Sequence, residues 1–439
     1  MSLASLLRGG QALAAAPWPR HDLSPAVWRR LVAELEHDPA SLAGLWADTE
    51  RVMALFTEGG QTWFVSCLVT ASGYDALSPV RPEAAFWQRL VHDLWGHRAH
   101  GVELPPLLDH GQWPVIAPLA ARPVQRTAPP APAVPAAPPA EGGFRVSLGP
   151  VQGRIAPAWR IEAAMQGERM VGIVPHLGHV HRGIPLLARG KPPRAAARFA
   201  ARIAADATIA HALAFARAAE AIAGEIPPPR ALALREAMAA AERITAALGR
   251  LAGLAGAGRM DPAGIPALVE GWREAAAQGF GHRLMMDCVV PGGLAADLAP
   301  AGAAAFGAAL ARTAAALAPA GPLGLRRSGA DRDRAIGREH AEIAAAVAAL
   351  RPLLADLPAG GVFRSPELAT GEGIGMAAGP RGTIWHWMRL DHGLIAAFFP
   401  IDPALAAWAR FTAACAGAAL SDLGEIAAAE RLSAAGADL

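Results

Sequence analysis

The alternation of apolar and polar residues predicts four elements in the first hundred residues. A helix is expected over Ser24–Leu35, with Ser24 as its N-cap and Pro25 at its first position. Two strands, Arg51–Phe56 and Thr62–Thr70, flank a glycine turn. A second helix is expected over Pro82–Trp95, where apolar residues recur at helical spacing. This part of the chain therefore reads as a small α+β unit.

The rest of the chain predicts more helix than strand. Long helices are expected over Arg194–Ala223 and Arg230–Leu254, and Pro403–Ser433 reads as mostly helical. The expected strands are Phe144–Leu148, Trp159–Ala164, Arg169–Val174 and a hairpin formed by Thr383–Arg389 and Leu394–Pro400. The fold class is therefore α+β, with a mainly helical second part that carries small β-hairpins.

A stretch rich in proline and alanine divides the chain. It covers Pro118–Gly143 and has almost no large apolar residue, so it cannot pack a core of its own. We therefore expect a first domain over residues 1–117, a linker over 118–143 and a second domain over 144–439.

Composition and charge exclude several classes of protein. Of 439 residues, 53% are hydrophobic and 18% are charged, which is typical of a globular chain. The net charge is +2, from 40 basic and 38 acidic residues. This balance does not indicate the clustered basic surface that binds nucleic acid. The apolar region from Ala295 to Gly324 is mostly alanine and contains prolines, so no transmembrane segment is expected. Three cysteines cannot build a four-cysteine zinc or iron–sulfur site.

The densest group of histidines lies in the segment Pro175–Gly183. His176, His179 and His181 could line a polar pocket or, with weaker support, bind a metal ion. If the backbone is extended, His179 and His181 point to one face. The alternative is a structural loop whose histidines bond to the backbone.

Two further groups could carry chemistry. Arg202 and Asp206 are four residues apart and could pair on one face of the expected helix, which also carries His211. That face is either solvated or a buried strip that lines a cavity. Arg381 follows Pro380 in a turn next to the predicted hairpin, where its guanidinium could hold an anion or a carboxylate.

Several segments in order resemble the large subunit of nickel–iron hydrogenases and its relative, the quinone-pocket subunit of respiratory complex I. They include GPVQGRIAPAWRIEAAMQGERMVGIVPHLGHVHRGI, CVVPGGLAADL, LRRSGADRDRA, GPRGTIWHWMRLDHG and LSDLGEIAAAERLSAAGADL. The segment AAFWQRLVHDLWGHRAHG is similar to the small complex I subunit that contacts this one. A fusion of the two modules is typical of energy-converting hydrogenases that resemble formate hydrogenlyase.

The departures from these families concern the metal and quinone sites. The hydrogenases bind nickel and iron through two CxxC pairs, and here Ala204 and Ala207 occupy the first pair while LSAAGADL lacks the second. Pro185 replaces a glutamate that relays protons in hydrogenases. The quinone-binding tyrosine of complex I corresponds to Ala205, and the first hairpin, VQGRIAPAW, lacks its histidine.

The resemblance implies a component of an oxidoreductase complex like NADH:quinone oxidoreductase, without hydrogenase activity. The chain would bind no metal, and a small partner subunit would hold an iron–sulfur cluster. Membrane-arm subunits would anchor the complex at the cytoplasmic face of the inner membrane. A modified cavity for a quinone or another electron acceptor would be lined by His176, His181, Arg202, Asp206, His211 and Arg381. The alternative is a redox-inactive structural subunit of an assembly that moves ions or bicarbonate.

Overall fold

The structure is a computed structural model, which describes residues 3–7, 10–71, 73–127, 142–151, 158–254, 264–318 and 330–439. The chain divides into two compact units. Unit 1 comprises Met1–Leu186, Ile401–Ile426 and Leu432–Leu439, and unit 2 comprises Leu187–Pro400 and Ala427–Arg431. Each unit is therefore built from segments that are distant in sequence.

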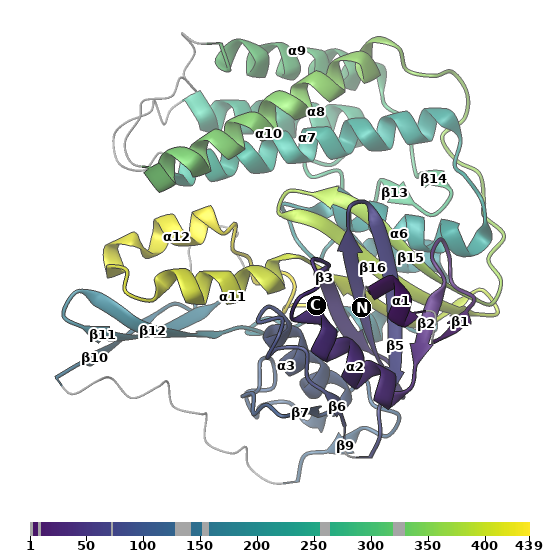
Figure 1. The fold of residues 1–439 in the computed structure, drawn as a ribbon. Helices are drawn as coiled ribbons and strands as arrows, with labels where there is room; N and C mark the ends of the chain where they lie inside the picture. Colours follow the sequence, from purple (N-terminus) through teal and green to yellow (C-terminus); the bar gives the residue numbers. More distant parts are fainter. Residues whose placement is uncertain are drawn as a thin grey trace. The chain divides into compact units, whose positions relative to one another are not determined.

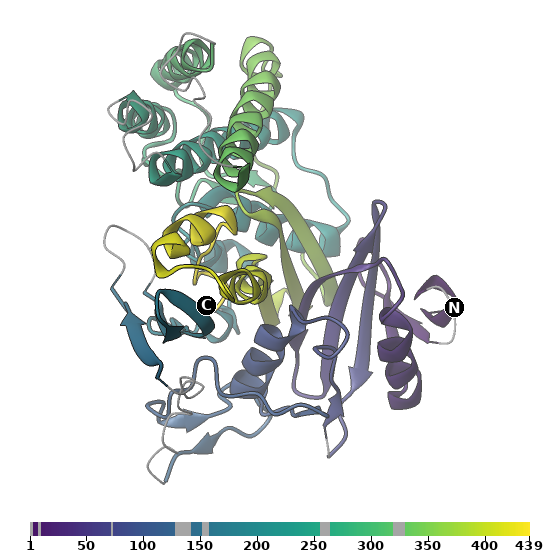
Figure 2. The ribbon, with the colours of Figure 1, turned by 60° about the vertical axis from the view of Figure 1, so that its left-hand side comes forward.

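Unit 1 contains a five-stranded sheet, whose strands run side by side in Figure 1 and Figure 2. The order is β1-β2-β5-β4-β3; β2 and β5 are parallel and the other neighbours are antiparallel. The β4–β5 hairpin confirms the two strands predicted around the glycine turn. The strands are β1 (Gln11–Leu13), β2 (Arg20–Leu23), β3 (Ser41–Ala47), β4 (Arg51–Glu58) and β5 (Gln61–Leu68).

The two helices predicted in this region are confirmed. Helix α2 (Pro25–Leu35) is capped by Ser24, whose Oγ accepts a hydrogen bond from the amide of Val27 at 3.3 Å. Helix α3 (Ala84–Trp95) packs against β3 and ends at Gly96, which has the left-handed φ of 76° that glycine favours. A short helix, α1 (Leu3–Leu7), precedes them.

A three-stranded antiparallel sheet also belongs to unit 1. Its strands are β10 (Phe144–Leu148), β11 (Arg160–Gln166) and β12 (Arg169–His176), as the sequence predicts within two residues. Helix α11 (Ala404–Cys415) packs against both β12 and α3. The helical prediction for the last part of the chain is thus confirmed by α11 and by α12 (Leu423–Ala429), with a short 3-10 turn, η1 (Leu420–Asp422), between them.

Unit 2 is organised around a second three-stranded sheet. It consists of β15 (Gly371–Gly379), β16 (Gly382–Asp391) and β17 (Leu394–Ile401), so the predicted hairpin is confirmed and β15 is an additional strand. Helix α6 (Thr208–Ala223) packs on β15 and β16. Glycines on β15 allow close approach, since a Cβ at Gly375 would stand 2.1 Å from the carbonyl oxygen of Ala214.

Unit 2 also contains four long helices. They are α7 (Pro229–Leu254), α8 (Gly264–Phe280), α9 (Pro300–Ala316) and α10 (Ala330–Ala355), and they pack side by side (Figure 1). Among the described helices, none is long and apolar enough to span a bilayer. The remaining elements are β6 (Tyr74–Asp75), β7 (Ala99–His100), β8 (Val115–Ile116), β9 (Val124–Gln125), α4 (Ile184–Ala188), α5 (Pro193–Ala200), β13 (Val289–Val290) and β14 (Gly293–Leu294).

The helix predicted over Arg194–Ala223 is wrong as one continuous element. Helix α5 ends at Ala200, the chain turns through residues 201–207, and α6 starts at Thr208. Ala207 has φ −139° and ψ 31°, which lies outside the helical region. Alanine-rich sequence favours helix on both sides of this point, so propensity alone gave no sign of the break.

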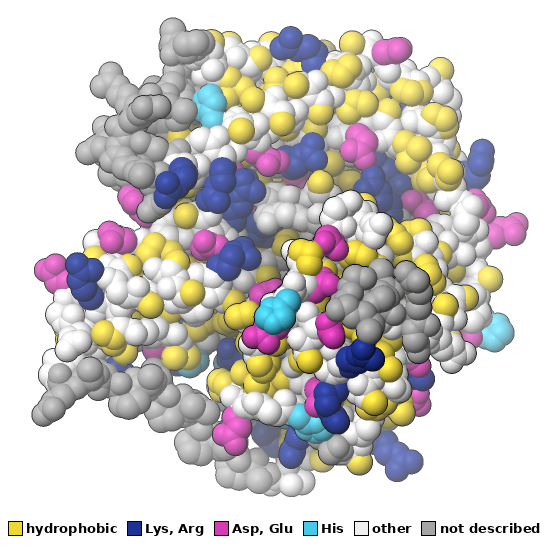
Figure 3. Space-filling view, in the orientation of Figure 1, with side chains coloured by type: hydrophobic (Ala, Val, Ile, Leu, Met, Phe, Trp, Pro, Cys, Tyr) yellow, Lys and Arg dark blue, Asp and Glu magenta, His cyan; other side chains and the backbone are white. Residues whose placement is uncertain are grey.

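The fold class is confirmed as α+β, with 41% helix and 24% strand. The linker and the two-domain division stay predictions, because residues 128–141 lie outside the described part of the chain. The same holds for most of the predicted first hairpin, residues 152–157. Basic and acidic side chains are interspersed over the face that Figure 3 draws, in keeping with the small net charge.

Candidate functional site

The N-terminus of α6 is capped by a side chain from another helix. Its own N-cap residue, Ala207, has no side-chain acceptor for the first amide groups. Glu242 of α7 supplies one instead, because its Oε2 accepts from the amide of Ile209 at 2.6 Å and its Oε1 from the amide of Ala210 at 2.9 Å. A carboxylate is favoured there by the positive end of the helix dipole.

Glu242 is a buried carboxyl group with an unusual acidity. Burial raises its pKa to about 8, and this outweighs the two backbone hydrogen bonds, which lower it. Two charged neighbours act in opposite directions: Asp206 raises the pKa and Arg381 lowers it. The protonation of Glu242 is therefore linked to that pair of residues.

Arg381 and Asp206 form an ion pair beside this cap. The Nη1 atom of Arg381 lies 2.5 Å from Oδ2 of Asp206, so the arginine fork holds a carboxylate. The arginine side chain is only 4% exposed, whereas that of Asp206 is 52% exposed. The pair thus connects a buried cation to the surface of unit 2.

The turn that carries Arg381 is fixed by a second set of charges. Arg431 donates to the carbonyl oxygen of Pro380 at 3.0 Å and to Glu339 of α10 at 2.9 Å. Glu339 is 2% exposed and also accepts from Arg250 of α7 at 2.7 Å. These contacts hold the β15–β16 turn against the helices and so set the position of Arg381.

Arg202 does not share a helix face with Asp206, so that expectation is wrong. Both residues lie in the non-helical segment 201–207. Arg202 forms a bidentate pair with Asp287 at 2.5 and 2.7 Å, and hydrogen bonds from Arg202 lower the pKa of Asp287. Both side chains are about half exposed. The hypothesis of a buried Arg202–Asp206 strip therefore fails.

The two alanines that the resemblance aligns with the first pair of hydrogenase cysteines are buried. Ala204 is 4% exposed and Ala207 is 0% exposed, while Ala205 between them is exposed. Their methyl groups offer no metal donor. Within the described ranges, no three His, Cys, Asp or Glu side chains are arranged to hold a metal ion. Nickel bound through four thiolates does not fit this donor set.

His211 is part of a buried pair of histidines in unit 2. Its Nδ1 atom lies 2.9 Å from Nε2 of His386, which β16 places against α6. Both residues are 0% exposed, and the rings of Phe215 and Phe398 pack around His386. In this contact one ring nitrogen must donate and the other accept, so at least one of the two imidazoles is neutral.

His176 and His181 belong to unit 1. His176 ends β12, and its Nε2 lies 3.5 Å from Oε1 of Glu162; burial lowers its pKa, with Arg160 adding to the effect. Its imidazole is therefore neutral near pH 7.

The remaining histidines of this segment lie beyond the end of the strand. Strand β12 ends at His176, and Gly178 turns the chain with a φ of 76°. The condition for His179 and His181 to share a strand face is therefore not met. The His181 Nδ1 atom contacts the carbonyl oxygen of Ala437 at 3.0 Å, and its ring packs on Trp113 at 5.1 Å. These contacts agree with the alternative interpretation, a structural loop whose histidines bond to the backbone.

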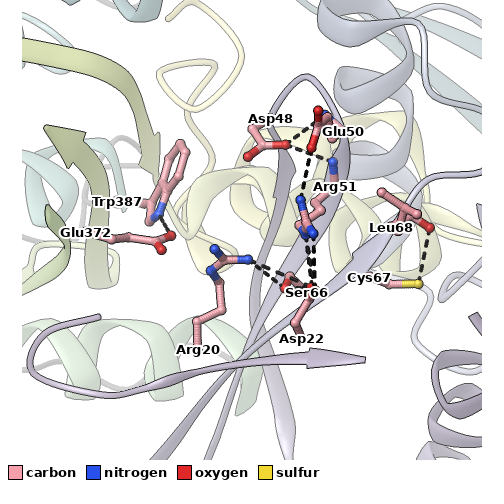
Figure 4. A network of polar contacts seen from close by, with 10 residues as sticks. All are labelled: Arg20, Asp22, Asp48, Glu50, Arg51, Ser66, Cys67, Leu68, Glu372 and Trp387. Atoms are coloured by element: carbon pink, nitrogen blue, oxygen red, sulfur yellow. Dashed lines mark hydrogen bonds and ion pairs between the residues drawn. The ribbon is translucent and has the colours of Figure 1, made fainter. Parts of the chain in front are cut away.

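A separate polar cluster lies on the five-stranded sheet of unit 1 (Figure 4). Asp22 of β2 accepts from Ser66 of β5 at 2.6 Å and from Arg51 of β4 at 3.1 Å. Although burial raises the pKa of Asp22, the hydrogen bonds from Arg51 and Ser66 bring it below its usual value. Arg20 completes the cluster through Ser66 at 2.8 Å. Because it ties three neighbouring strands together, we interpret this cluster as structural.

Glu242 and His386 belong to these groups, although neither is among the candidate residues that the sequence patterns indicate. Glu242 appears in the sequence as one acid in the alanine-rich stretch MAAAERI. Its helical spacing from Met238, four residues earlier, places it on a buried side of α7, and that is the signal that could have identified it. His386 alternates with Trp385 and Trp387 in a strand, and nothing local distinguishes it from sheet packing.

Comparison with known proteins identifies a fold. No family model and no curated protein sequence matches the chain. Among solved structures, a chain of the membrane-bound sulfane sulfur reductase, an archaeal respiratory membrane complex, aligns with a TM-score of 0.58 and 18% identity. The alignment covers 69% of this chain and 100% of that chain.

A second solved structure gives the same result. The Ni-Fe-Se hydrogenase from D. vulgaris Hildenborough aligns with a TM-score of 0.56 and 13% identity, over 68% of this chain and 100% of that chain. At these identities the likeness concerns the fold and not the chemistry. The chain therefore has a hydrogenase-like fold.

Proposed function

We propose that this chain is a large-subunit-like component of an oxidoreductase assembly related to complex I and the energy-converting hydrogenases. Its role there is to provide a modified cavity for a quinone or another electron acceptor. The observation that carries this proposal is the group at the N-terminus of α6, where a buried acid and an Asp206–Arg381 pair stand beside Ala204 and Ala207. The structural likeness to a chain of a respiratory membrane complex supports it.

The donor set determines what chemistry this group can supply. Alanine methyl groups cannot replace the thiolates of a nickel–iron centre, so the chain itself carries no hydrogen-activating metal. Arg381 can donate hydrogen bonds to an acceptor oxygen, and Glu242 can hold a proton near neutral pH. Electrons would therefore arrive from an iron–sulfur cluster of a small partner subunit, and protons from this chain.

The same proposal covers the setting of the assembly. Membrane-arm subunits would anchor it, and this chain would lie on them as a peripheral subunit at the cytoplasmic face. NADH is the electron donor that the resemblance to complex I favours.

A second candidate function follows from the two buried alanines. Ala204 and Ala207 are buried, as expected if the former metal position is filled by packing. In that case the chain is a redox-inactive, structural subunit of an assembly that moves ions or bicarbonate. The two functions differ in whether electrons reach the N-terminus of α6.

The experiment is purification of the native complex through a tag on this chain. We expect co-purified membrane subunits, an iron–sulfur signal in electron paramagnetic resonance, and less than about one-tenth nickel per chain by elemental analysis. Arg381→Gln should reduce acceptor reduction about tenfold or more, as expected for the loss of one charged hydrogen bond at a reacting group. Asp287→Asn, which alters the exposed pair, should leave it unchanged.

Other outcomes would refute parts of the proposal. One nickel per chain would refute the metal-free site. A complex without any redox centre, whose assembly is complete, would favour the structural function. Purification of this chain without any other subunit would refute the proposed assembly.

A further inference from the structure

We propose that Glu242, with Asp206 and Arg381, forms a proton-binding site at the N-terminus of α6, in which the ion pair sets how tightly the proton is held. The inference concerns the same group as the proposed function, but it rests on the geometry within unit 2 and needs no partner subunit. The ligand is a single proton exchanged with water, and no electrons move.

The carboxyl group of Glu242 is buried against the first amides of α6. Glu242 is 8% exposed and comes from α7, while its two oxygens face the amides of Ile209 and Ala210. A buried carboxylate is costly unless it is compensated, and two backbone hydrogen bonds supply only part of that compensation. The balance between the charged and neutral forms is therefore close, as its pKa of about 8 reflects.

Charged side chains from two other segments act on Glu242. From the segment between α5 and α6, Asp206 acts against the ionised form of Glu242, and from the β15–β16 turn Arg381 acts in its favour. The neighbouring Arg243 is directed elsewhere, since its Nε lies 3.6 Å from Glu342 of α10. The backbone amides of α6 favour ionisation. The net field at Glu242 thus depends on how well Asp206 neutralises Arg381.

One member of the ion pair is accessible to solvent. The side chain of Asp206 is 52% exposed, so its carboxylate is open to solvent while the side chains of Arg381 and Glu242 stay buried. A change at this exposed carboxylate alters the field at the buried one. Protonation of Glu242 consumes one proton from water and forms one O–H bond, and deprotonation returns that proton.

The test is an infrared titration of the isolated full-length chain, which follows the C=O stretch of a protonated carboxyl group. Glu242→Gln identifies the band by removing it, and Glu236→Gln, on the same helix but half exposed, serves as the control that leaves it. In the unaltered protein we expect a midpoint near pH 8.

Two variants then give opposite shifts. Asp206→Asn should move the midpoint down, because it removes the neighbouring negative charge, and Arg381→Gln should move it up, each by about one pH unit. If Arg381→Gln fails to fold, Arg381→Lys keeps the charge and should leave the midpoint in place. The shift in Asp206→Asn then tests the role of the ion pair.

A midpoint in the ordinary carboxyl range near pH 4.5 would overturn the proton site. Shifts of the same sign, or no shift in Asp206→Asn, would overturn the role of the ion pair. Failure of this titration leaves the assembly proposal standing, since that depends on co-purification; failure of co-purification leaves the titration standing.

Discussion

Two ion pairs of unit 2 have the same chemistry but different surroundings. Arg381 pairs with Asp206 while the arginine side chain is 4% exposed, and Arg202 pairs with Asp287 while both side chains are about half exposed. Water can solvate Arg202 when its partner is removed, but it reaches Arg381 poorly. The environment of the cation, and not the presence of a pair, should therefore decide what each pair contributes.

This difference predicts unequal effects of two matched substitutions. Asp206→Asn should lower the free energy of unfolding by about 1–3 kcal/mol, because the buried cation Arg381 keeps a neutral amide oxygen in place of the carboxylate that balances its charge. Asp287→Asn should lower it by less than about 1 kcal/mol. Urea denaturation followed by circular dichroism measures both. Equal losses would mean that the burial of Arg381 has no energetic consequence.

Among the elements, α6 depends on its contact with β15, a strand in which four of nine residues are glycine. Gly375 on β15 faces the backbone of α6, and a Cβ there would lie 2.1 Å from the Ala214 oxygen and 2.3 Å from the Ala218 nitrogen. Backbone atoms cannot move aside as a flexible side chain can. The helix and the strand would have to separate to admit even a methyl group.

Alanine substitutions at two glycines should therefore have opposite signs. Gly375→Ala should destabilise the protein by about 2–3 kcal/mol through overpacking. Gly307→Ala, at an exposed site of α9 with nothing within 4 Å, should stabilise it by about 0.5–1 kcal/mol through helix propensity. Thermal unfolding of both variants checks the prediction, and a stable Gly375→Ala protein would show that α6 and β15 are loosely packed.

The elements that periodicity predicted well are those with strong local signals. The Ser24 cap and the glycine turn after β4 both act within a few residues, so the sequence shows them directly. The break before α6 has no such signal, since alanines continue through it and the acceptor for its first amides comes from Glu242, over thirty residues later. For the same reason the sequence indicated that Arg381 could hold an anion or a carboxylate but could not name Asp206 as its partner.

At the scale of the whole molecule, several partly buried histidines link stability to pH. Burial is the largest cause that lowers the pKa of His97, His176 and His181 in the folded protein. In the unfolded chain the same groups titrate near pH 6.5. Below that pH the unfolded state binds protons that the folded state does not, so stability falls as the pH falls.

The histidine contribution should therefore lower the melting temperature between about pH 7 and pH 5, whereas the raised pKa of Glu242 acts in the opposite direction over the same range. Each histidine that stays neutral when folded contributes a slope of at most about 1.4 kcal/mol per pH unit in this window. His97→Gln should reduce the slope, because it removes one titrating group while its amide can still contact the carbonyl oxygen of Asp48. Calorimetry at three pH values measures the slope in both proteins; an unchanged slope in His97→Gln would contradict the assignment.

The division of the chain into interleaved units has a consequence for its synthesis on the ribosome. Unit 1 receives α11, and unit 2 receives Arg431, only from residues that follow Pro400. Until those residues emerge, α3 lacks the helix that packs on it, and the turn bearing Arg381 lacks the arginine that fixes it. A nascent chain of about 400 residues thus exposes apolar surface in unit 1 and leaves the buried Glu339 of unit 2 without one of its arginine partners. Such a chain should need a chaperone until the segment from Ile401 to Arg431 has emerged, although most of unit 2 has already been synthesised.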